Sequence, residues 1–246
     1  MFAKRNTRQQ GGVLFDEFVV YDPDQAYPKY IIHYTKGGTL GNPNTQIKFG
    51  GTFTTGRQEV LPTRGLDPYD PLDVHFRIAE SQFLRLVNNL GGNMSKLKVK
   101  KVDVYMNPVL KGKFDAKLAE FKTKYTATPQ HSQYLMLFHG TKSRDAVTNI
   151  MDNNFQCSLG GKFGPGVYFS EYPSYTFGYG GMSHLIVAQV LPGKTFAMPA
   201  PRNQPLEPGY DSHGGVARGD GTFAEIVIFN TDQILPCYVI HIEETA

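Results

Sequence analysis

Short apolar runs separated by turns dominate most of the chain, and they are interspersed with segments of helical spacing. The strand-like runs occupy residues 97–106, 134–139, 166–170, 184–192, 225–230 and 237–243. Apolar residues at helical spacing are found in a segment from about Pro71, and in residues 111–124, 144–153 and 173–179. Because these elements do not follow a βαβα rhythm, the pattern predicts an α+β fold with largely antiparallel sheets and short flanking helices.

The first quarter of the chain has a different pattern. Residues 13–34 are typical of two short strands, FDEFVVYD and KYIIHY, joined by a Pro/Asp turn. Residues 37–67 are rich in Gly, Thr, Asn and Pro, which favours a linker or a loose loop with a strand or two. We therefore expect a strand pair within residues 1–36, a linker over residues 37–67 and one folded domain over residues 68–246.

The chain also contains an internal repeat. Residues 13–34 align without gaps on residues 221–242, and nine of the 22 positions are identical, including Glu17 and Glu225. Two origins are open: the first copy is the tail of a preceding domain of the same kind, which we favour, or a duplicated strand pair that extends the sheet of this domain. A two-stranded hairpin is at best marginally stable alone, so an ordered first copy would need a packing partner.

Composition and charge narrow the classes of function. Hydrophobic residues make up 40% of the chain and charged residues 19%, as in ordinary globular proteins. The net charge of +3 is too small to indicate nucleic acid as a main partner. No run approaches the roughly 18 apolar residues of a membrane span, and the N-terminus lacks the apolar core of a signal peptide. With only two cysteines, Cys157 and Cys237, we expect an intracellular protein, nuclear or cytoplasmic, with reduced thiols.

Motifs for metals and phosphates are missing from the sequence. The histidines and cysteines show neither HxxxH nor CxxC spacing, so no metal site is expected. The glycines of GGKFGPG (160–166) are not spaced as in a dinucleotide-binding GxGxxG motif. PGKT (192–195) lacks the first glycine of a P-loop, because Ala188 stands in its place.

Three strand ends carry the candidate chemistry. LFHGT places His139 and Gly140 where an apolar strand ends, and GVYFS places Tyr168 in a strand after a glycine-rich loop. AEIVIF begins with Glu225, a carboxylate at the head of an apolar strand. A buried unpaired charge is expensive, so such a residue usually lies at a surface edge, is paired, or works in a site. Each feature alone has an ordinary structural explanation, and only their combination points to a function.

In order and spacing, these features resemble the catalytic domain of the poly(ADP-ribose) polymerases, the diphtheria-toxin-like ADP-ribosyltransferases. The resemblance covers about residues 70–246 and is carried by LFHGTKSRDAVTNIMDNNF, FGPGVYFSEYPSYTFGYG, GYDSHGG and EIVIFNTDQILPCYVIHI. Residues 17–34 are similar to the last strands of tankyrase-type domains. The resemblance implies the ADP-ribosyltransferase fold with split β-sheets, NAD as co-substrate, no metal, and a protein acceptor, which could be the chain itself.

The resemblance assigns the family's catalytic His-Tyr-Glu set to His139, Tyr168 and Glu225. Nicotinamide in NAD is already cationic and leaves without a strong general acid. A carboxylate beside the ribose can stabilise the oxocarbenium-like transition state and polarise an incoming hydroxyl. Family members that extend polymers usually carry a glutamate here, so Glu225 permits polymer formation, although some glutamate-bearing members transfer a single unit.

The resemblance also assigns contacts with NAD. Gly140 would offer its backbone N–H and C=O to the nicotinamide carboxamide, and Thr176 matches a serine that donates to the same amide. Tyr179 matches a tyrosine that stacks on the ring, and Thr141 falls where a serine often contacts the adenosine ribose. The loop 156–163 corresponds to a loop over the NAD site. The expected NAD-binding residues are thus His139, Gly140, Thr141, Tyr168, Thr176 and Tyr179.

We therefore expect an NAD-dependent protein ADP-ribosyltransferase that releases nicotinamide and extends poly(ADP-ribose). One alternative is transfer of a single ADP-ribose unit. The other is a non-catalytic module that binds NAD or ADP-ribose on the same fold. The presence of His139, Tyr168 and Glu225 together favours an enzyme.

Overall fold

The computed structural model describes residues 3–10, 13–20, 55–62, 71–87, 96–217 and 223–244. The chain divides into two compact units, Met1–Lys48 and Phe49–Ala246. In the first unit, β1 (Ala3–Gln10) and β2 (Val13–Val20) form an antiparallel pair. The predicted strand KYIIHY lies outside the described residues. The strand β1 was not predicted, because AKRNTRQQ lacks apolar alternation.

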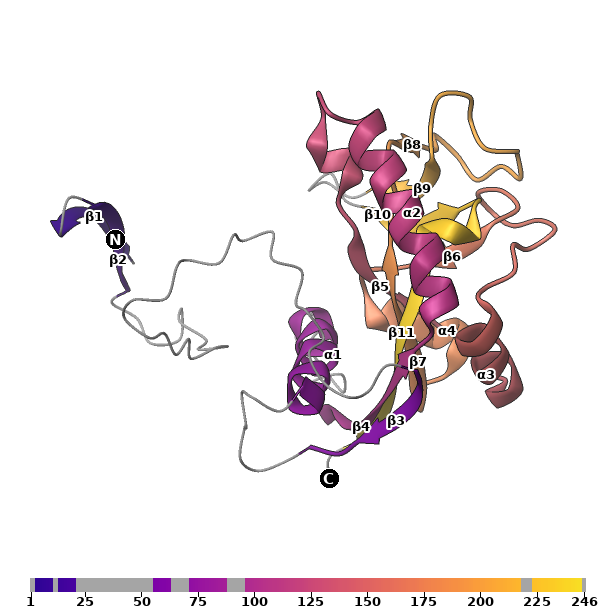
Figure 1. The fold of residues 1–246 in the computed structure, drawn as a ribbon, viewed down its shortest axis with the longest axis horizontal. Helices are drawn as coiled ribbons and strands as arrows, with labels where there is room; N and C mark the ends of the chain where they lie inside the picture. The colour runs from indigo at the N-terminus through magenta and orange to yellow at the C-terminus, as the bar shows by residue number, and fades with distance from the viewer. Residues whose placement is uncertain are drawn as a thin grey trace. The chain divides into compact units, whose positions relative to one another are not determined.

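The second unit contains two sheets, which confirm the α+β prediction (Figure 1). The five-stranded sheet is antiparallel throughout and has the order β3 (Gly56–Val60), β4 (Leu97–Met106), β11 (Ile234–Glu244), β7 (His184–Val190) and β5 (Leu135–His139). The four-stranded sheet has the order β6 (Val167–Phe169), β10 (Phe223–Ile228), β9 (Ser212–Ala217) and β8 (Thr195–Ala197). Only its β8–β9 pair is parallel.

Four α-helices occur where helical spacing predicted them: α1 (Pro71–Val87), α2 (Pro108–Lys124), α3 (Arg144–Asn153) and α4 (Pro173–Gly180). Two short 3₁₀ segments, Pro129–Ser132 and Thr231–Gln233, connect other elements. The start of α2 shows why a helix begins at this point. The Asn107 side chain accepts from the backbone N–H groups of Val109 and Leu110, and Pro108 occupies the first turn. Figure 1 shows α1 beside β3 and β4.

Two hydrophobic cores flank the five-stranded sheet. One joins its strands to α1 and α2, with Phe76, Phe83, Val104, Phe114 and Phe138 among its members. The other joins residues of both sheets to α3, with Leu137, Met151, Phe169, Ile186 and Ile228 among its members. Leu137 and Phe138 are successive residues of β5 and belong to different cores, because successive side chains of a strand point to opposite faces. β5 is therefore held on both faces just before His139.

The strand β3 lies within residues 37–67, where we expected a linker. It pairs with residues Val102–Met106 of β4, and its Val60 is buried in the first core. Its Arg57 binds the buried carboxylate of Asp103 at 2.9 Å. This part of the expected linker is therefore an edge strand of the second unit, whereas the complete division of the chain remains a prediction.

The strands β8 and β9 lie between the predicted strands 184–192 and 225–230, where the sequence pattern indicated no strand. The sequence SHGGVA does not look like a strand, because two glycines stand at its centre. A Cβ at Gly214 would lie 2.5 Å from the Phe223 ring, and one at Gly215 would overlap the ring of Phe163. These glycines leave room for aromatic rings to lie on the strand, and this packing replaces the missing apolar alternation.

Candidate active site

Backbone pairing brings the predicted strand ends together. The N–H of Phe138 donates to the carbonyl of Ser170 at 2.8 Å, and the N–H of Ser170 donates to the carbonyl of Phe138 at 3.0 Å. This bridge joins the end of β5 to the end of β6. On its other side β6 pairs with β10, where Tyr168 lies opposite Val227. The ends of β5 and β6 and the start of β10, which are distant in sequence, thus border one pocket.

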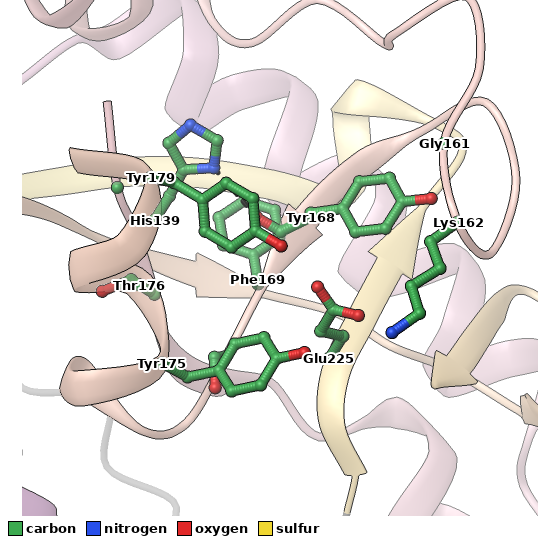
Figure 2. A pocket seen from close by; sticks show the side chains of 11 residues that line it. His139, Gly161, Lys162, Tyr168, Phe169, Tyr175, Thr176, Tyr179 and Glu225 are labelled. Carbon is green, nitrogen blue, oxygen red and sulfur yellow. Dashed lines mark hydrogen bonds between the residues drawn. The ribbon is translucent and has the colours of Figure 1, made fainter. Parts of the chain in front are cut away.

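The pocket is lined by residues from β5, the 156–163 loop, β6, α4 and β10 (Figure 2). Its volume is about 270 Å³, at the small end of the roughly 300–1,000 Å³ of small-molecule sites, so it fits a ring-sized group. The lining residues are His139, Gly140, Gly161, Lys162, Tyr168, Phe169, Ser170, Tyr175, Thr176, Tyr179 and Glu225.

Most of the residues singled out in the sequence meet in this pocket. His139, Gly140, Tyr168, Thr176, Tyr179 and Glu225 all line it. Thr141 does not belong to the lining residues, so its expected contact with an adenosine ribose remains a prediction. Lys162 and Tyr175 also line the pocket, although no role was predicted for either of them.

His139 is fixed by one hydrogen bond and two aromatic contacts. Its Nδ1 lies 2.9 Å from the carbonyl oxygen of Tyr168, and because a carbonyl only accepts, Nδ1 carries the proton. The rings of Phe155 and Phe169 pack against the imidazole at centroid distances of 5.0 and 5.8 Å. Burial lowers the pKa of His139, against the opposing effect of the Tyr168 carbonyl. The neutral ring leaves Nε2 as a hydrogen-bond acceptor.

The hydroxyl of Tyr168 holds the loop that precedes its own strand. It accepts from the N–H of Phe163 and donates to the carbonyl of Gly164, both at 2.8 Å. A Cβ at Gly161 would overlap this hydroxyl, so the loop approaches Tyr168 as closely as a glycine allows. Tyr168 therefore offers its ring to the pocket while its hydroxyl is occupied by the loop.

Gly140 allows α4 to pack directly against the end of β5. A Cβ at this position would overlap the carbonyl oxygen of Thr176, and a Cβ at Gly180 would lie 2.7 Å from the backbone nitrogen of Thr141. The hydroxyl of Thr176 donates to the carbonyl of Pro173 at 2.6 Å. To donate to a bound amide, as the resemblance implies, this hydroxyl has to exchange that partner.

Two tyrosines of α4 face the carboxylate of Glu225. Tyr175 and Tyr179 are four residues apart, so they lie on the same side of the helix. Tyr179 is 61% exposed, which leaves a ring face available to a planar ligand, whereas Tyr175 is half-buried. The i, i+4 spacing is the sequence signal that could have placed Tyr175 in the site together with Tyr179.

Glu225 is buried, which excludes a solvated strand start. It is 3% exposed and lies opposite Gly215 in the β9–β10 pair. Burial raises the pKa of Glu225, and the charge of Lys162 and hydrogen bonds from Tyr175 and Tyr179 act in the opposite direction. Its Oε2 has no hydrogen-bond partner, although Oε2 is fully buried. A buried carboxylate oxygen without a partner is costly, and such atoms in a native structure often mark a functional site.

Lys162 reaches the site because the loop around it is anchored. The ring of Phe163 lies on Gly215, directly beside Glu225 in the sheet, and its carbonyl lies 2.8 Å from Nδ1 of His213. Figure 2 shows the Lys162 side chain extended toward the carboxylate. The sequence could not indicate this orientation, since it depends on Phe163 packing on a glycine more than fifty residues away.

The described ranges of the chain lack two kinds of feature. In these ranges no group of three or more His, Cys, Asp or Glu side chains is arranged to hold a metal ion. No helix there combines the length and the apolar character needed to cross a membrane. Both cysteines are free, Cys157 half-buried and Cys237 buried.

The geometry suits the recognition of a planar amide joined to a sugar. Tyrosine rings can stack on a flat aromatic group, and the backbone of Gly140 can pair with an amide. The carboxylate of Glu225 can accept from a sugar hydroxyl and stabilise positive charge that develops on the sugar.

Comparisons with known proteins give the family. A family model described as the poly(ADP-ribose) polymerase catalytic domain matches residues 88–237. The chain is also similar in structure to the TASOR pseudo-PARP domain, with a TM-score of 0.59 and 13% sequence identity over 77% of this chain and 99% of that chain. At this identity the structural similarity shows the fold alone. The family match spans more than half of the sequence, and the chain therefore belongs to the poly(ADP-ribose) polymerase catalytic domain family.

Proposed function

We propose that this protein is an NAD-dependent ADP-ribosyltransferase that modifies protein acceptors and releases nicotinamide. The observation that carries the proposal is the buried carboxylate of Glu225, whose Oε2 lacks a partner in a pocket bordered by His139 and three tyrosines. A purely structural glutamate at this position would be expected to have both oxygens satisfied.

The pocket residues fit the nicotinamide end of NAD. The exposed ring of Tyr179 and the ring of Tyr168 provide aromatic faces for the base. The backbone of Gly140 and the hydroxyl of Thr176 would pair with the carboxamide. The unpartnered Oε2 of Glu225 would accept a hydrogen bond from a ribose hydroxyl.

When bound, NAD supplies a cationic leaving group and an electrophilic sugar carbon. The ionised carboxylate of Glu225 stabilises positive charge on that sugar and polarises the hydroxyl of the acceptor. Lys162, Tyr175 and Tyr179 favour this ionised form against the effect of burial. The neutral His139 keeps Nε2 as an acceptor for a substrate hydroxyl.

The number of ADP-ribose units that are transferred is also part of the proposal. We infer that Glu225 allows ADP-ribose chains to be extended, with transfer of single units as the alternative. The acceptors are proteins, including the chain itself, and the site of action is the nucleus or the cytoplasm. We expect neither nucleic acid nor a membrane as a partner, because the net charge is only +3 and no long apolar run is present.

A second candidate function is non-catalytic binding of NAD or ADP-ribose. The similarity to the TASOR pseudo-PARP domain is compatible with it. His139, Tyr168 and Glu225 all border one pocket, which supports the enzyme.

Incubation with labelled NAD, followed by a gel and an assay of free nicotinamide, separates these functions. Chain extension gives a smear of label on protein, and transfer of single units gives a discrete band. In both cases nicotinamide is released, and Glu225→Gln prevents it. Binding of NAD without label transfer or nicotinamide release would support the non-catalytic module and exclude the proposed enzyme.

A further inference from the structure

Tyr175 lines the same pocket as Glu225, and none of the contacts with NAD described above is assigned to it. It belongs to α4, and as a hydrogen-bond donor its hydroxyl acts to lower the pKa of the Glu225 carboxyl group. Figure 2 shows its ring directed to Glu225 from the helix, whereas Lys162 approaches from the loop on the other side. Glu225 is therefore approached by a neutral donor from α4 and by a cation from the 156–163 loop.

The helix that carries Tyr175 is firmly placed. Pro173, Thr176 and Gly180 are its buried residues, and the carbonyl of Thr176 is in close contact with Gly140. The N–H of Tyr175 donates to the carbonyl of Tyr172 at 3.1 Å in the first turn. Because α4 packs so closely on β5, the Tyr175 ring projects into the pocket from a rigid support.

The two oxygens of Glu225 are not equivalent. Oε2 is buried without a hydrogen-bond partner, whereas Oε1 is not among the buried oxygens that lack one. A glutamate carboxyl group turns readily about its last torsion, since that torsion has broad, roughly two-fold preferences. A donor that holds Oε1 restricts this rotation and keeps Oε2 directed into the pocket.

We propose that Tyr175 is a positioning residue for Glu225: its hydroxyl holds one carboxylate oxygen, so that Oε2 is presented to the ribose hydroxyl of the substrate. This inference rests on the proposed function, because it concerns the same site. It is distinct from ring stacking, which we assign to Tyr179. Tyr175 acts on the substrate only through Glu225.

Tyr179 provides a matched control on the same helix face. Its hydroxyl also acts to lower the pKa of Glu225, but Tyr179 is 61% exposed, so water can replace that donor. Tyr175 is half-buried, and its hydroxyl is harder to replace. The titratable groups that face Glu225 or line its pocket are Lys162 from the loop, His139 from β5, Tyr168 from β6, and Tyr175 and Tyr179 from α4.

A direct titration tests the hydrogen bond without relying on turnover. The protein is labelled with ¹³C at the glutamate carboxyl carbons, and Glu225 is identified by the signal that Glu225→Gln removes. A donor to the ionised carboxylate lowers its pKa, so Tyr175→Phe should raise the pKa of Glu225 by about 1 unit. Tyr179→Phe should raise it by clearly less. An unchanged Glu225 titration in Tyr175→Phe would overturn the inference.

Nicotinamide release then tests the consequence for the reaction. Tyr175→Phe should lower kcat about tenfold, as expected for one hydrogen bond to a charged group, with KM for NAD within about twofold of the original. The acid limb of the pH profile should move to higher pH, because Glu225 must be ionised to act. A thermal unfolding curve checks that the variant remains folded.

The outcomes separate the two proposals. If Glu225→Gln is inactive while Tyr175→Phe keeps the original kcat and pH profile, the inference on Tyr175 is wrong and the proposed function stands. If the original protein releases no nicotinamide, the proposed enzyme is wrong, and the carboxyl titration alone decides whether Tyr175 holds Glu225.

Discussion

The strands β2 and β10 are copies of one sequence pattern, but their neighbours differ. In β2, Glu17 lies opposite Asn6 of β1, and β1 is the strand that pairs with it in the described part of the first unit. In β10, Glu225 lies opposite Gly215 of β9, while β6 pairs along the other edge (Figure 1). The same glutamate thus belongs to a hairpin in one copy and to an interior strand in the other.

This difference between the two copies indicates that the strands next to the glutamate decide whether it belongs to a site. β6 brings Tyr168 beside β10, and the glycine of β9 opposite Glu225 leaves room for Phe163, which anchors the loop. β5 adds His139 through its bridge to β6. The strand β1, which pairs with β2 in the described part of the first unit, contains neither a His-Gly pair nor a tyrosine.

The largest expected effect compares the two glutamates directly. Glu225→Gln should lower ADP-ribosyl transfer by about 10²–10³, since it removes a preorganised electrostatic contact. Glu17→Gln should leave transfer unchanged. Both rates are measured as labelled nicotinamide release. If Glu17→Gln were as inactive as Glu225→Gln, the first copy would belong to the working domain.

The next prediction concerns the packing of α4 on the end of β5, which borders the same pocket as β10. Gly140→Ala should displace α4, because the new Cβ overlaps the carbonyl oxygen of Thr176. We expect benzamide binding to weaken more than about tenfold and the free energy of unfolding to fall by about 1–3 kcal/mol. Calorimetric titration and denaturant unfolding measure the two effects.

Gly178→Ala is the matched control in the same helix. A Cβ at Gly178 meets nothing within 4 Å, so benzamide binding should not change. The free energy of unfolding should rise by about 0.5–1 kcal/mol, since alanine is the better helix former. Equal losses of binding in both variants would show that packing of α4 on β5 does not shape the pocket.

A smaller effect is expected from removing the exposed ring of Tyr179. Tyr179→Ala should weaken benzamide binding by about 1 kcal/mol, because aromatic pairs contribute about 0.5–1.5 kcal/mol beyond burial. Tyr175→Phe keeps its ring and should bind benzamide normally. A normal affinity in Tyr179→Ala would remove this tyrosine from the ring-binding surface.

The smallest effect is expected from removing the first copy altogether. A chain that begins at Phe49 keeps the whole second unit, and its nicotinamide release should match the full chain within about twofold. A loss of about tenfold or more would show that the β1–β2 hairpin supports the site.

A chain that begins at Gly65 provides the contrast, because it also lacks β3. It loses the burial of Val60 and the contact of Arg57 with Asp103. Burial of a valine alone contributes roughly 1.5–3 kcal/mol, so the free energy of unfolding should fall by at least that amount. Equal stability of the two shortened chains would show that β3 contributes little to the sheet.

Local sequence pattern predicted much of the second unit. The strand at 97–106 and the helices near 71, 111–124, 144–153 and 173–179 are present, because their apolar spacing matches the period of each element. The strands β8 and β9 were missed because aromatic rings pack on glycines there, and no local period records such packing. The strand β3 was missed as part of the sheet, because it lies in a segment that resembles a linker.

By itself, the sequence determined the family and pointed to His139, Tyr168 and Glu225, since the three ordered blocks that contain them can be recognised without coordinates. Only the tertiary structure decided that Glu225 is buried, that Oε2 lacks a partner, and that Lys162 and Tyr175 face it from opposite sides. The physical reason is that burial and hydrogen bonding of one carboxylate depend on contacts among β10, α4 and the 156–163 loop. These segments are distant in sequence, and no local pattern encodes how they approach one another.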